Sequence, residues 1–245
     1  MSETLNSENQ TSSQATSPSE HGSTAEGIKL NGLYAFKEGM ATIYTEKGEA
    51  IPVTVLRYET WKVSQIKTQA KDGYSAVQLA AVPKKSKNAG AAESNHLKAA
   101  GFESGARYVK ELRTTHLPDG LKLGDALSID TLAKGDVVKI TSTSKGHGFQ
   151  GSVRRWNFAG GPATHGSKFH RRPGSSGNRT WPGRVMPGKK FPGHWGDETI
   201  TVKNVVVVDV IASEGVVLVK GPVPGSKNTL VRLVKLAKPT KLVKG

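Results

Sequence analysis

Short runs of alternating or β-branched apolar residues recur in the first and last parts of the chain. The run 61–66 alternates apolar and polar positions with period two, as a half-buried strand does. Other runs are almost continuously apolar, such as 205–211. Glu46-Lys47-Gly48 separates two runs and predicts a hairpin turn. The predicted strands are 41–45, 51–56, 61–66, 74–79, 137–140, 205–211, 216–220 and 230–234.

One segment has helical character. Residues 89–100 are rich in alanine and end at Gly101, and glycine commonly terminates a helix. Many short strands with turn signals and little helix predict a mainly β fold, a small barrel or sandwich with a minor α+β part.

The segment between the two strand-rich parts has a different pattern. Residues 137–195 contain no Asp or Glu, but they hold eleven Lys or Arg residues and three of the four tryptophans. Gly and Pro recur as Arg172-Pro173-Gly174, Trp181-Pro182-Gly183 and similar triplets. Because Gly and Pro recur so often, we expect neither a helix nor a regular sheet in this segment. The sequence therefore predicts an extended, irregular loop over 142–196.

Composition and charge narrow the class of protein. The chain has 245 residues and a formal net charge of +15, which indicates a polyanionic partner. It has no cysteine, so a disulfide framework, a thiol nucleophile and a Cys-ligated metal are excluded. Neither a membrane-spanning run nor a signal peptide is recognisable, and we expect a cytoplasmic protein.

The charge is unevenly distributed. Residues 1–27 contain four acidic and no basic residues, together with many Ser, Thr, Asn and Gln, and this composition predicts a disordered acidic tail. A tail that folds on a partner is the alternative. Without the tail, the remaining chain carries a net charge of about +19.

The residue types in the loop suit RNA. Lys and Arg neutralise phosphates, Arg and aromatic rings stack on unpaired bases, and Gly lets the backbone approach phosphate closely. A disordered basic linker is the other interpretation, but such linkers are poor in aromatic residues. The candidate RNA-binding residues are Lys145, His147, Arg154, Arg155, Trp156, His165, Lys168, His170, Arg171, Arg172, Arg179, Trp181, Arg184, Lys189, Lys190, His194 and Trp195.

Three enzyme-like patterns are weak here. Residues 146–151 match G-x-G-x-x-G, but no helix is expected next and Arg171 stands where a dinucleotide site needs an acid. The loop histidines have no neighbouring carboxylate to complete a metal site. They also lack a nearby acid for a Ser-His-Asp triad, although an acid distant in sequence could fold in. We therefore expect no cofactor, no metal and no small-molecule substrate.

Several motifs, in order along the chain, identify a family. Together they closely resemble the bacterial type of ribosomal protein L three, over roughly residues 28–245. The matching motifs are 39–44 (GMATIY), 51–55 (IPVTV), 141–158 (TSTSKGHGFQGSVRRWNF), 163–167 (ATHGS), 172–177 (RPGSSG), 181–185 (WPGRV), 188–190 (GKK) and 218–225 (LVKGPVPG).

This resemblance implies a fold and a set of domains. The family has a Greek-key β-barrel resembling those of translation factors, with a smaller α+β insertion. The implied division is a barrel from 28–141 and 197–245, an insertion around 60–118, and an RNA-embedded loop over 142–196. The acidic tail 1–27 has no counterpart in the family.

The resemblance also implies a function. It predicts a non-enzymatic constituent of the large ribosomal subunit, without a membrane partner, that binds large-subunit (23S) rRNA and neighbouring ribosomal proteins. Such a protein nucleates assembly near the 3′ end of the rRNA and extends its loop toward the peptidyl-transferase centre. In some bacteria a glutamine at the loop tip is methylated, but Thr180 occupies that position here, so no modification is expected. A free RNA chaperone and an RNA-modifying enzyme are the alternatives.

Overall fold

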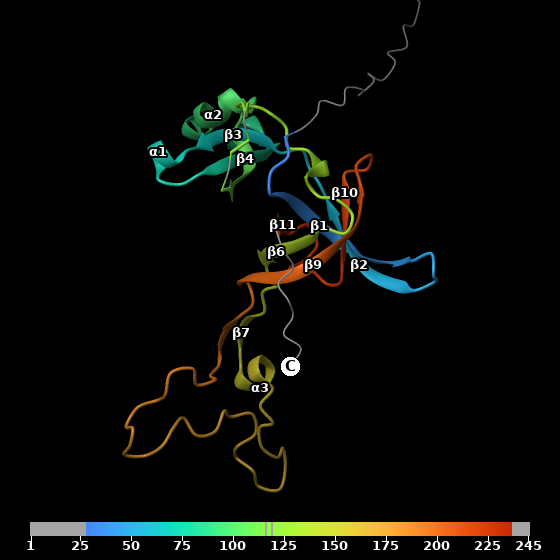
Figure 1. Ribbon diagram of the computed structural model, residues 1–245. Coiled ribbons are helices and arrows are strands. Elements are labelled where there is room, and N and C mark those ends of the chain that lie inside the picture. Colours follow the sequence, from blue (N-terminus) through green and yellow to red (C-terminus); the bar gives the residue numbers. More distant parts are fainter. Residues whose placement is uncertain (1–27, 116, 119, 237–245) are drawn as a thin grey trace, which may run out of the picture.

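The computed structural model describes residues 28–115, 117–118 and 120–236 (Figure 1). The predicted acidic tail 1–27 lies outside the described residues. Among the described residues the fold is mainly β. A closed barrel, a separate three-stranded sheet and a long projecting segment are its three parts.

The barrel consists of six antiparallel strands. Around the barrel they follow the order β1-β11-β6-β9-β10-β2, and β2 pairs with β1 to close it. Strands distant in sequence are therefore neighbours, which the sequence pattern alone does not determine. The strands are β1 (Gly32–Tyr44), β2 (Ala50–Arg57), β6 (Val137–Thr143), β9 (Thr199–Ile211), β10 (Val216–Lys220) and β11 (Leu230–Lys235).

Alternating side chains fill the barrel. In β6, β10 and β11 every second residue is buried, as expected for strands with one face on a core. Ile140, Val219 and Leu233 are completely buried, and so is Leu56 from β2. Burial of an aliphatic side chain of this size contributes about 1.5–3 kcal/mol, so this interior is the main source of barrel stability.

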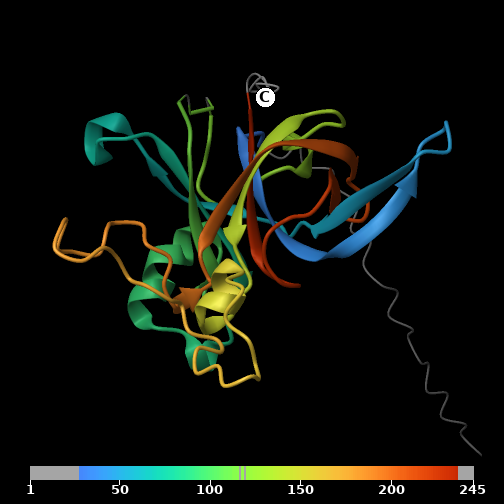
Figure 2. The ribbon, with the colours of Figure 1, turned by 90° about the horizontal axis from the view of Figure 1, so that it is seen from below.

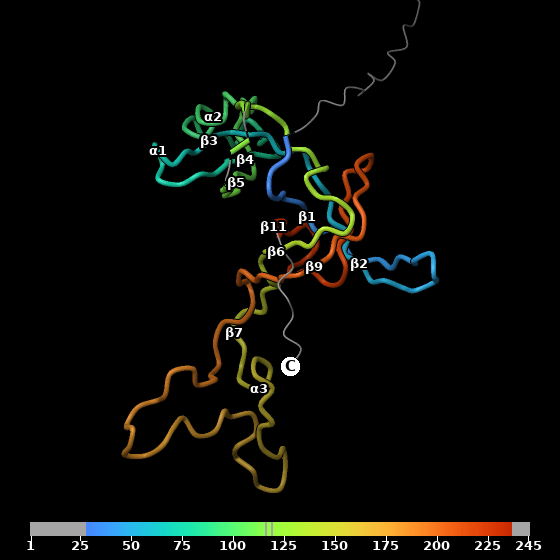
Figure 3. The backbone as a smooth tube through the Cα atoms, in the orientation of Figure 1, coloured from blue at the N-terminus to red at the C-terminus, as the bar shows by residue number. Residues whose placement is uncertain are grey.

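The β1–β2 hairpin extends beyond the barrel. The two strands pair from Phe36 and Arg57 out to Tyr44 and Ala50, whereas β11 pairs with β1 only from Gly32 to Phe36. The predicted turn at residues 46–48 lies at the hairpin tip, where Gly48 has a φ of +79°. The projecting part of this hairpin, residues 39–52, is called the arm below (Figure 3).

The second sheet forms the α+β part. Its strands follow the order β3-β4-β5, and the helical turns α2 and η2 contribute Leu97 and Ala100 to a small core with Phe102. The predicted helix 89–100 is confirmed as these two consecutive turns, which end at Gly101 in a left-handed conformation. The elements are β3 (Lys62–Lys67), α1 (Gln69–Asp72), β4 (Ala76–Pro83), η1 (Ser86–Asn88), α2 (Ala91–Leu97), η2 (Lys98–Ala100) and β5 (Ala106–Arg113).

The sheet packs on the barrel through aromatic residues. Trp61 is completely buried, and its ring centroid lies 5.1 Å from that of Tyr34 in β1. The Tyr34 hydroxyl donates to the carbonyl oxygen of Glu111 in β5 at 2.7 Å. The chain then returns to the barrel through η3 (Ile129–Thr131), so one hydrophobic core continues from barrel to sheet.

Candidate nucleic-acid interface

The long segment between β6 and β9 projects from the barrel (Figures 1 and 2). We call this segment, residues 144–198, the excursion. The predicted loop began at residue 142, but Ser142 and Thr143 still belong to β6 and pair with Ile200 and Thr199. Ten Lys or Arg residues lie in the excursion, and its only acids, Asp197 and Glu198, are its last two residues.

The prediction that no helix or sheet enters this segment was wrong near the barrel. Strand β7 (Gly148–Gln150) pairs with β8 (Gly193–Trp195), and the five-residue helix α3 (Ser152–Trp156) follows β7. Neighbouring residues could not indicate this pairing, because the two limbs stabilise each other across more than 40 positions of sequence. Beyond α3 the expected irregular conformation is observed from Asn157 to Pro192.

Backbone bonds and a ring stack join the two limbs where they leave the barrel. The Ser144 amide donates to the Glu198 carbonyl at 2.8 Å, and the His147 amide donates to the Trp195 carbonyl at 2.9 Å. The imidazole of His147 stacks on the Trp195 ring, with 3.9 Å between centroids. Gly196 is required between them, because its φ is +78° and a Cβ there would lie 2.1 Å from the Lys145 carbonyl oxygen.

A second contact between the limbs involves α3. The carbonyl oxygen of Phe191 accepts hydrogen bonds from Arg155 Nη1 at 3.0 Å and from Trp156 Nε1 at 2.9 Å. Lys190 Nζ lies 5.5 Å from the centroid of the Trp156 ring, on which the Arg155 guanidinium also packs. Gly193 leaves room for this guanidinium, since a Cβ would lie 2.5 Å from Nη1. Arg155 and Trp156 thus have structural contacts within the protein.

The distal half of the excursion is held by short turns. The Gly161 amide donates to the His170 carbonyl at 2.6 Å, and a Cβ on Gly161 would lie 2.9 Å from the Phe169 ring. Trp181 is 85% exposed, the highest value among the large apolar side chains described. An indole left so open on a free chain is available for contact with another molecule.

The structure places the seventeen candidate residues in two groups. His147, Arg155 and Trp195 are half-buried between the limbs near the barrel, so their first contacts are with the protein. The other fourteen are exposed along the excursion. Phe149, which the sequence analysis did not select, is 76% exposed on β7 next to this basic surface. Its position in a strand of only three residues gave no periodic signal.

The described residues of the G-x-G-x-x-G sequence and the loop histidines are not arranged as a cofactor, metal or catalytic site. A helix does follow the G-x-G-x-x-G sequence, contrary to expectation, but α3 is barely one turn long and carries two arginines. Across the described residues, no three His, Asp or Glu side chains gather in a way that could hold a metal ion. The loop histidines are spread from the barrel end of the excursion, at His147, to its distal turns, at His165 and His170.

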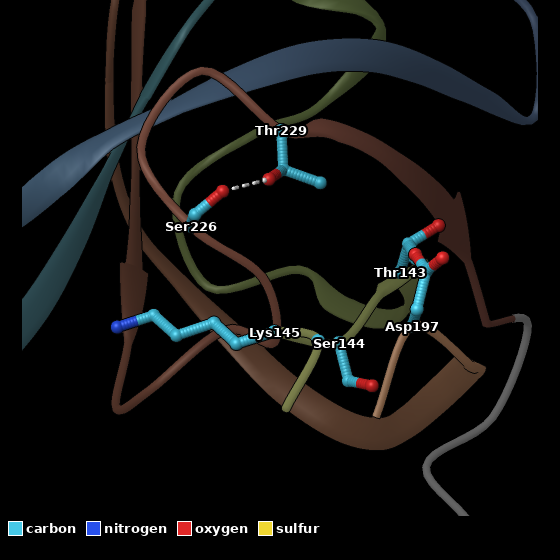
Figure 4. A pocket seen from close by; sticks show the side chains of 7 residues that line it. Thr143, Ser144, Lys145, Asp197, Ser226 and Thr229 are labelled. Atoms are coloured by element: carbon cyan, nitrogen blue, oxygen red, sulfur yellow. Dashed lines mark hydrogen bonds between the residues drawn. The ribbon is translucent and has the colours of Figure 1, made fainter. Parts of the chain in front are cut away.

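A polar cavity of about 550 Å³ lies where the excursion meets the barrel (Figure 4). Hydroxyl groups of Ser226 and Thr229, which are 3.0 Å apart, line one side, and Lys145 and Asp197 line the other. Nearby, burial lowers the pKa of Lys37, and the positive charge of Lys145 lowers this pKa further. The cavity combines hydroxyl and ammonium donors, and it includes loop residues after β10 that the sequence analysis did not connect with the excursion.

A closed barrel that projects a basic, almost acid-free excursion is typical of RNA-binding proteins of ribonucleoprotein particles. A family profile described as Ribosomal protein L3 matches residues 122–216. The chain is 72% identical over 209 residues to "Large ribosomal subunit protein uL3" of Bdellovibrio bacteriovorus, covering 85% of this chain and 94% of that protein. The chain therefore belongs to the uL3 family of ribosomal proteins.

More distant relatives cover a similar share of the chain. The protein named "Large ribosomal subunit protein uL3" of Desulfotalea psychrophila is 48% identical, over 84% of this chain and 98% of its own length. The protein of the same name from Herpetosiphon aurantiacus is 45% identical, over 86% of this chain and 99% of its own length.

Family membership confirms the predicted class. The chain is a structural ribosomal protein that takes part in translation at the cytoplasmic ribosome, and it is not an enzyme. None of the helices in the described part of the chain has the length and apolar character needed to span a bilayer.

Proposed function

We propose that this chain is a structural constituent of the large ribosomal subunit that binds large-subunit rRNA directly through its excursion. The single observation that carries the proposal is that the excursion is rich in basic residues and that most of these are exposed. Ten basic residues lie in the excursion, and most of them are exposed and without an acidic neighbour. In isolation these charges repel one another, whereas phosphates would neutralise them and release counterions.

The two ends of the molecule have different roles in this proposal. The barrel (28–141 and 197–245), with its α+β insertion around 60–118, rests on the surface of the subunit. The exposed excursion fills gaps between RNA helices, where phosphates would otherwise repel. The family resemblance further suggests that this binding nucleates subunit assembly near the 3′ end of the rRNA.

The distal excursion is proposed to approach the peptidyl-transferase centre. Two limbs of about 27 residues each reach at most ~90 Å at ~3.3 Å per residue, and the turns shorten this to several tens of ångströms. Arg179 and Trp181 are exposed near the middle of the excursion, the guanidinium suited to phosphates and the indole to stacking. Neither residue contributes chemistry to peptide-bond formation.

Sedimentation tests the proposal against its rivals. The full chain is expected to remain bound to large subunits after a wash at moderate salt. In these subunits it should resist digestion by a protease that is free of ribonuclease. A free RNA chaperone would sediment away from the subunits. An RNA-modifying enzyme would change the nucleotide composition of the rRNA, which mass spectrometry of digested rRNA detects. Either result would overturn the proposal.

Substitutions at the tip test its position. Arg179→Ala and Trp181→Ala each remove a contact worth about 1–3 kcal/mol if it is made with RNA. We expect subunits that still assemble but show altered chemical reactivity of nucleotides around the catalytic centre, and altered sensitivity to drugs of that centre. Thr164→Ala, an exposed change elsewhere in the excursion, is the matched control. Unchanged reactivity together with unchanged drug response would show that the tip does not reach the centre.

A further inference from the structure

The arm extends away from the excursion. In two views at right angles, the β1–β2 hairpin and the excursion leave the barrel in different directions (Figures 1 and 2). The exposed residues of the arm include Tyr44, which is 75% exposed, and Met40, which is 54% exposed. A two-stranded ribbon with exposed large apolar residues is marginally stable by itself in water. The arm is therefore a surface that a contact with another molecule would stabilise.

A groove of about 790 Å³ lies between the arm and the outer side of the barrel. Its walls are contributed by the end of the arm and by strands β9 and β10, and most of the surface lining it is apolar. Ile43 and Ile51 face each other across the hairpin. The apolar lining residues are Ile43, Tyr44, Ile51, Val208, Ile211 and Leu218.

The charge around this groove is the opposite of that on the excursion. Glu46, Glu49 and Asp209 line it, against only Lys47 and Lys134. The side chains of Glu46 and Glu49 are exposed. A local excess of carboxylates on a chain with a net charge of +15 is unfavourable for RNA phosphates and favourable for basic groups.

The backbone of the arm offers a second mode of contact. Beyond Phe36, strand β1 has left β11, and from Gly39 to Tyr44 its pairing in the described part of the chain is with β2 alone. One edge of the arm therefore keeps free amide and carbonyl groups, to which an extended segment can add as a further strand.

We infer that the groove beside the arm binds an extended, basic segment of a neighbouring ribosomal protein, rather than RNA. Apolar side chains of that segment would cover Ile43, Ile51 and Leu218, while its Lys or Arg side chains would pair with Glu46 and Glu49. This inference rests on the proposed function, because the large subunit supplies the partner. It adds a protein-binding surface to a molecule whose excursion is directed at RNA.

Site-specific crosslinking in intact large subunits tests the inference. The full chain carries the photoreactive amino acid p-benzoylphenylalanine in place of Tyr44, and a second preparation carries it in place of Trp181. We expect the Tyr44 probe to crosslink to a Lys- or Arg-rich segment of a ribosomal protein, and the Trp181 probe to crosslink to rRNA. Crosslinking of the Tyr44 probe to rRNA or to an acidic protein segment, or no crosslink at all, would overturn the inference.

A charge variant then tests the mode of binding. The crosslinked segment, made as a fluorescent peptide, is titrated with the full chain carrying Glu49→Lys. Binding should weaken at least two- to fivefold, since the change replaces an attraction by a repulsion. Glu103→Lys, an exposed reversal of equal charge outside the groove, should leave the affinity unchanged. Equal affinities of both variants would overturn the inference. Absence of the chain from subunits would instead contradict the proposed function.

Discussion

At the scale of single residues, two glycines with nearly equal backbone angles have different roles. Gly196 and Gly188 have φ values of +78° and +79°, which only glycine adopts without strain. A Cβ on Gly188 would meet nothing within 4 Å, whereas one on Gly196 would lie 2.1 Å from a carbonyl oxygen and 2.9 Å from His147 Nδ1. Only Gly196 is also needed for the contact between the two limbs.

This difference predicts unequal effects of the same substitution. Gly188→Ala should cost only the left-handed strain of about 1–2 kcal/mol, confined to a distal turn. Gly196→Ala adds a backbone clash and should separate the limbs, so the amide protons of Ser144 and His147 exchange at least tenfold faster. Hydrogen exchange followed by mass spectrometry measures this. If both variants exchange alike at these amides, the limbs do not depend on Gly196.

The half-buried phenol of Tyr58 makes the stability of the fold depend on alkaline pH. Burial raises the pKa of Tyr58 to about 12, and its hydroxyl donates to the carbonyl of Leu127. In the unfolded chain the phenol has a pKa of about 10, so it ionises before the folded form does. The stability that neutral Tyr58 contributes is thus present below pH 10 and is lost as the pH rises toward 12.

Tyr58→Phe removes this titration. Between pH 9 and pH 11, we expect the free energy of unfolding of the unsubstituted protein to fall by about 1 kcal/mol more than that of the variant. Urea denaturation at the two pH values measures the difference. Tyr34, whose pKa burial also raises, is common to both proteins and cancels in the comparison. A parallel loss in both proteins would show that Tyr58 does not titrate on unfolding in this range.

At the scale of elements, the excursion is ordered unevenly. Near the barrel, the two limbs are held by the β7–β8 pair and by the hydrogen bond from Arg155 in α3 to the carbonyl oxygen of Phe191. The distal pair Arg171-Arg172 is exposed, whereas Lys190 packs on the Trp156 ring next to this contact. Local opening is easiest where few contacts must be broken.

Limited proteolysis of the free protein should reveal this difference. We expect trypsin to cut first at Arg171-Arg172, and more slowly at Arg154-Arg155 and Lys189-Lys190, while the barrel stays intact. In large subunits all three sites should be protected by RNA. Mass spectrometry of the early fragments identifies the order. First cleavage at Arg154-Arg155 would contradict the uneven order of the excursion, and resistance of all three sites in the free chain would contradict its dependence on RNA.

The elements also show how far sequence reasoning reaches. Strands such as β6 and β10 were predicted by their short runs of β-branched apolar residues next to turn signals. Strand β5 was missed because Arg107, Lys110 and Glu111 interrupt its apolar positions. The part of β1 before residue 41 was missed because it contains Gly32 and Gly39. The excursion and its exposed basic residues were predicted from composition. The bond from Arg155 to Phe191 could not be, since it joins positions 36 residues apart that carry no shared pattern.

At the scale of the whole molecule, charge is divided between two directions. The excursion, which carries ten basic residues, and the arm, which carries Glu46 and Glu49, leave the barrel in different directions (Figure 2). RNA affinity should therefore depend on the excursion far more than on total charge. The salt dependence of RNA binding measures the contribution of the excursion. Each phosphate that the protein neutralises makes the slope of log affinity against log salt concentration steeper.

A deletion makes this quantitative. With ten phosphate contacts, the logarithm of affinity for rRNA should fall against the logarithm of salt with a slope of roughly −7 to −9. Replacing residues 158–188 by a short glycine-serine linker removes five of the ten basic residues and should reduce the slope by about 4. Filter binding over a series of salt concentrations measures both slopes. A slope near zero, or one that the deletion leaves unchanged, would contradict binding through the excursion.

The excursion begins and ends on adjacent, paired strands of a closed barrel. Thr143 and Thr199 are direct partners, so the 55 residues between them form one large hairpin loop. The entropy lost on closing such a loop rises only with the logarithm of its length, and doubling the length costs about 0.6 kcal/mol. Insertions and deletions in the distal turns should therefore be almost neutral for the folding of the barrel. Selection can adjust the reach of this loop to its ribosome while the rest of the protein keeps the same sequence.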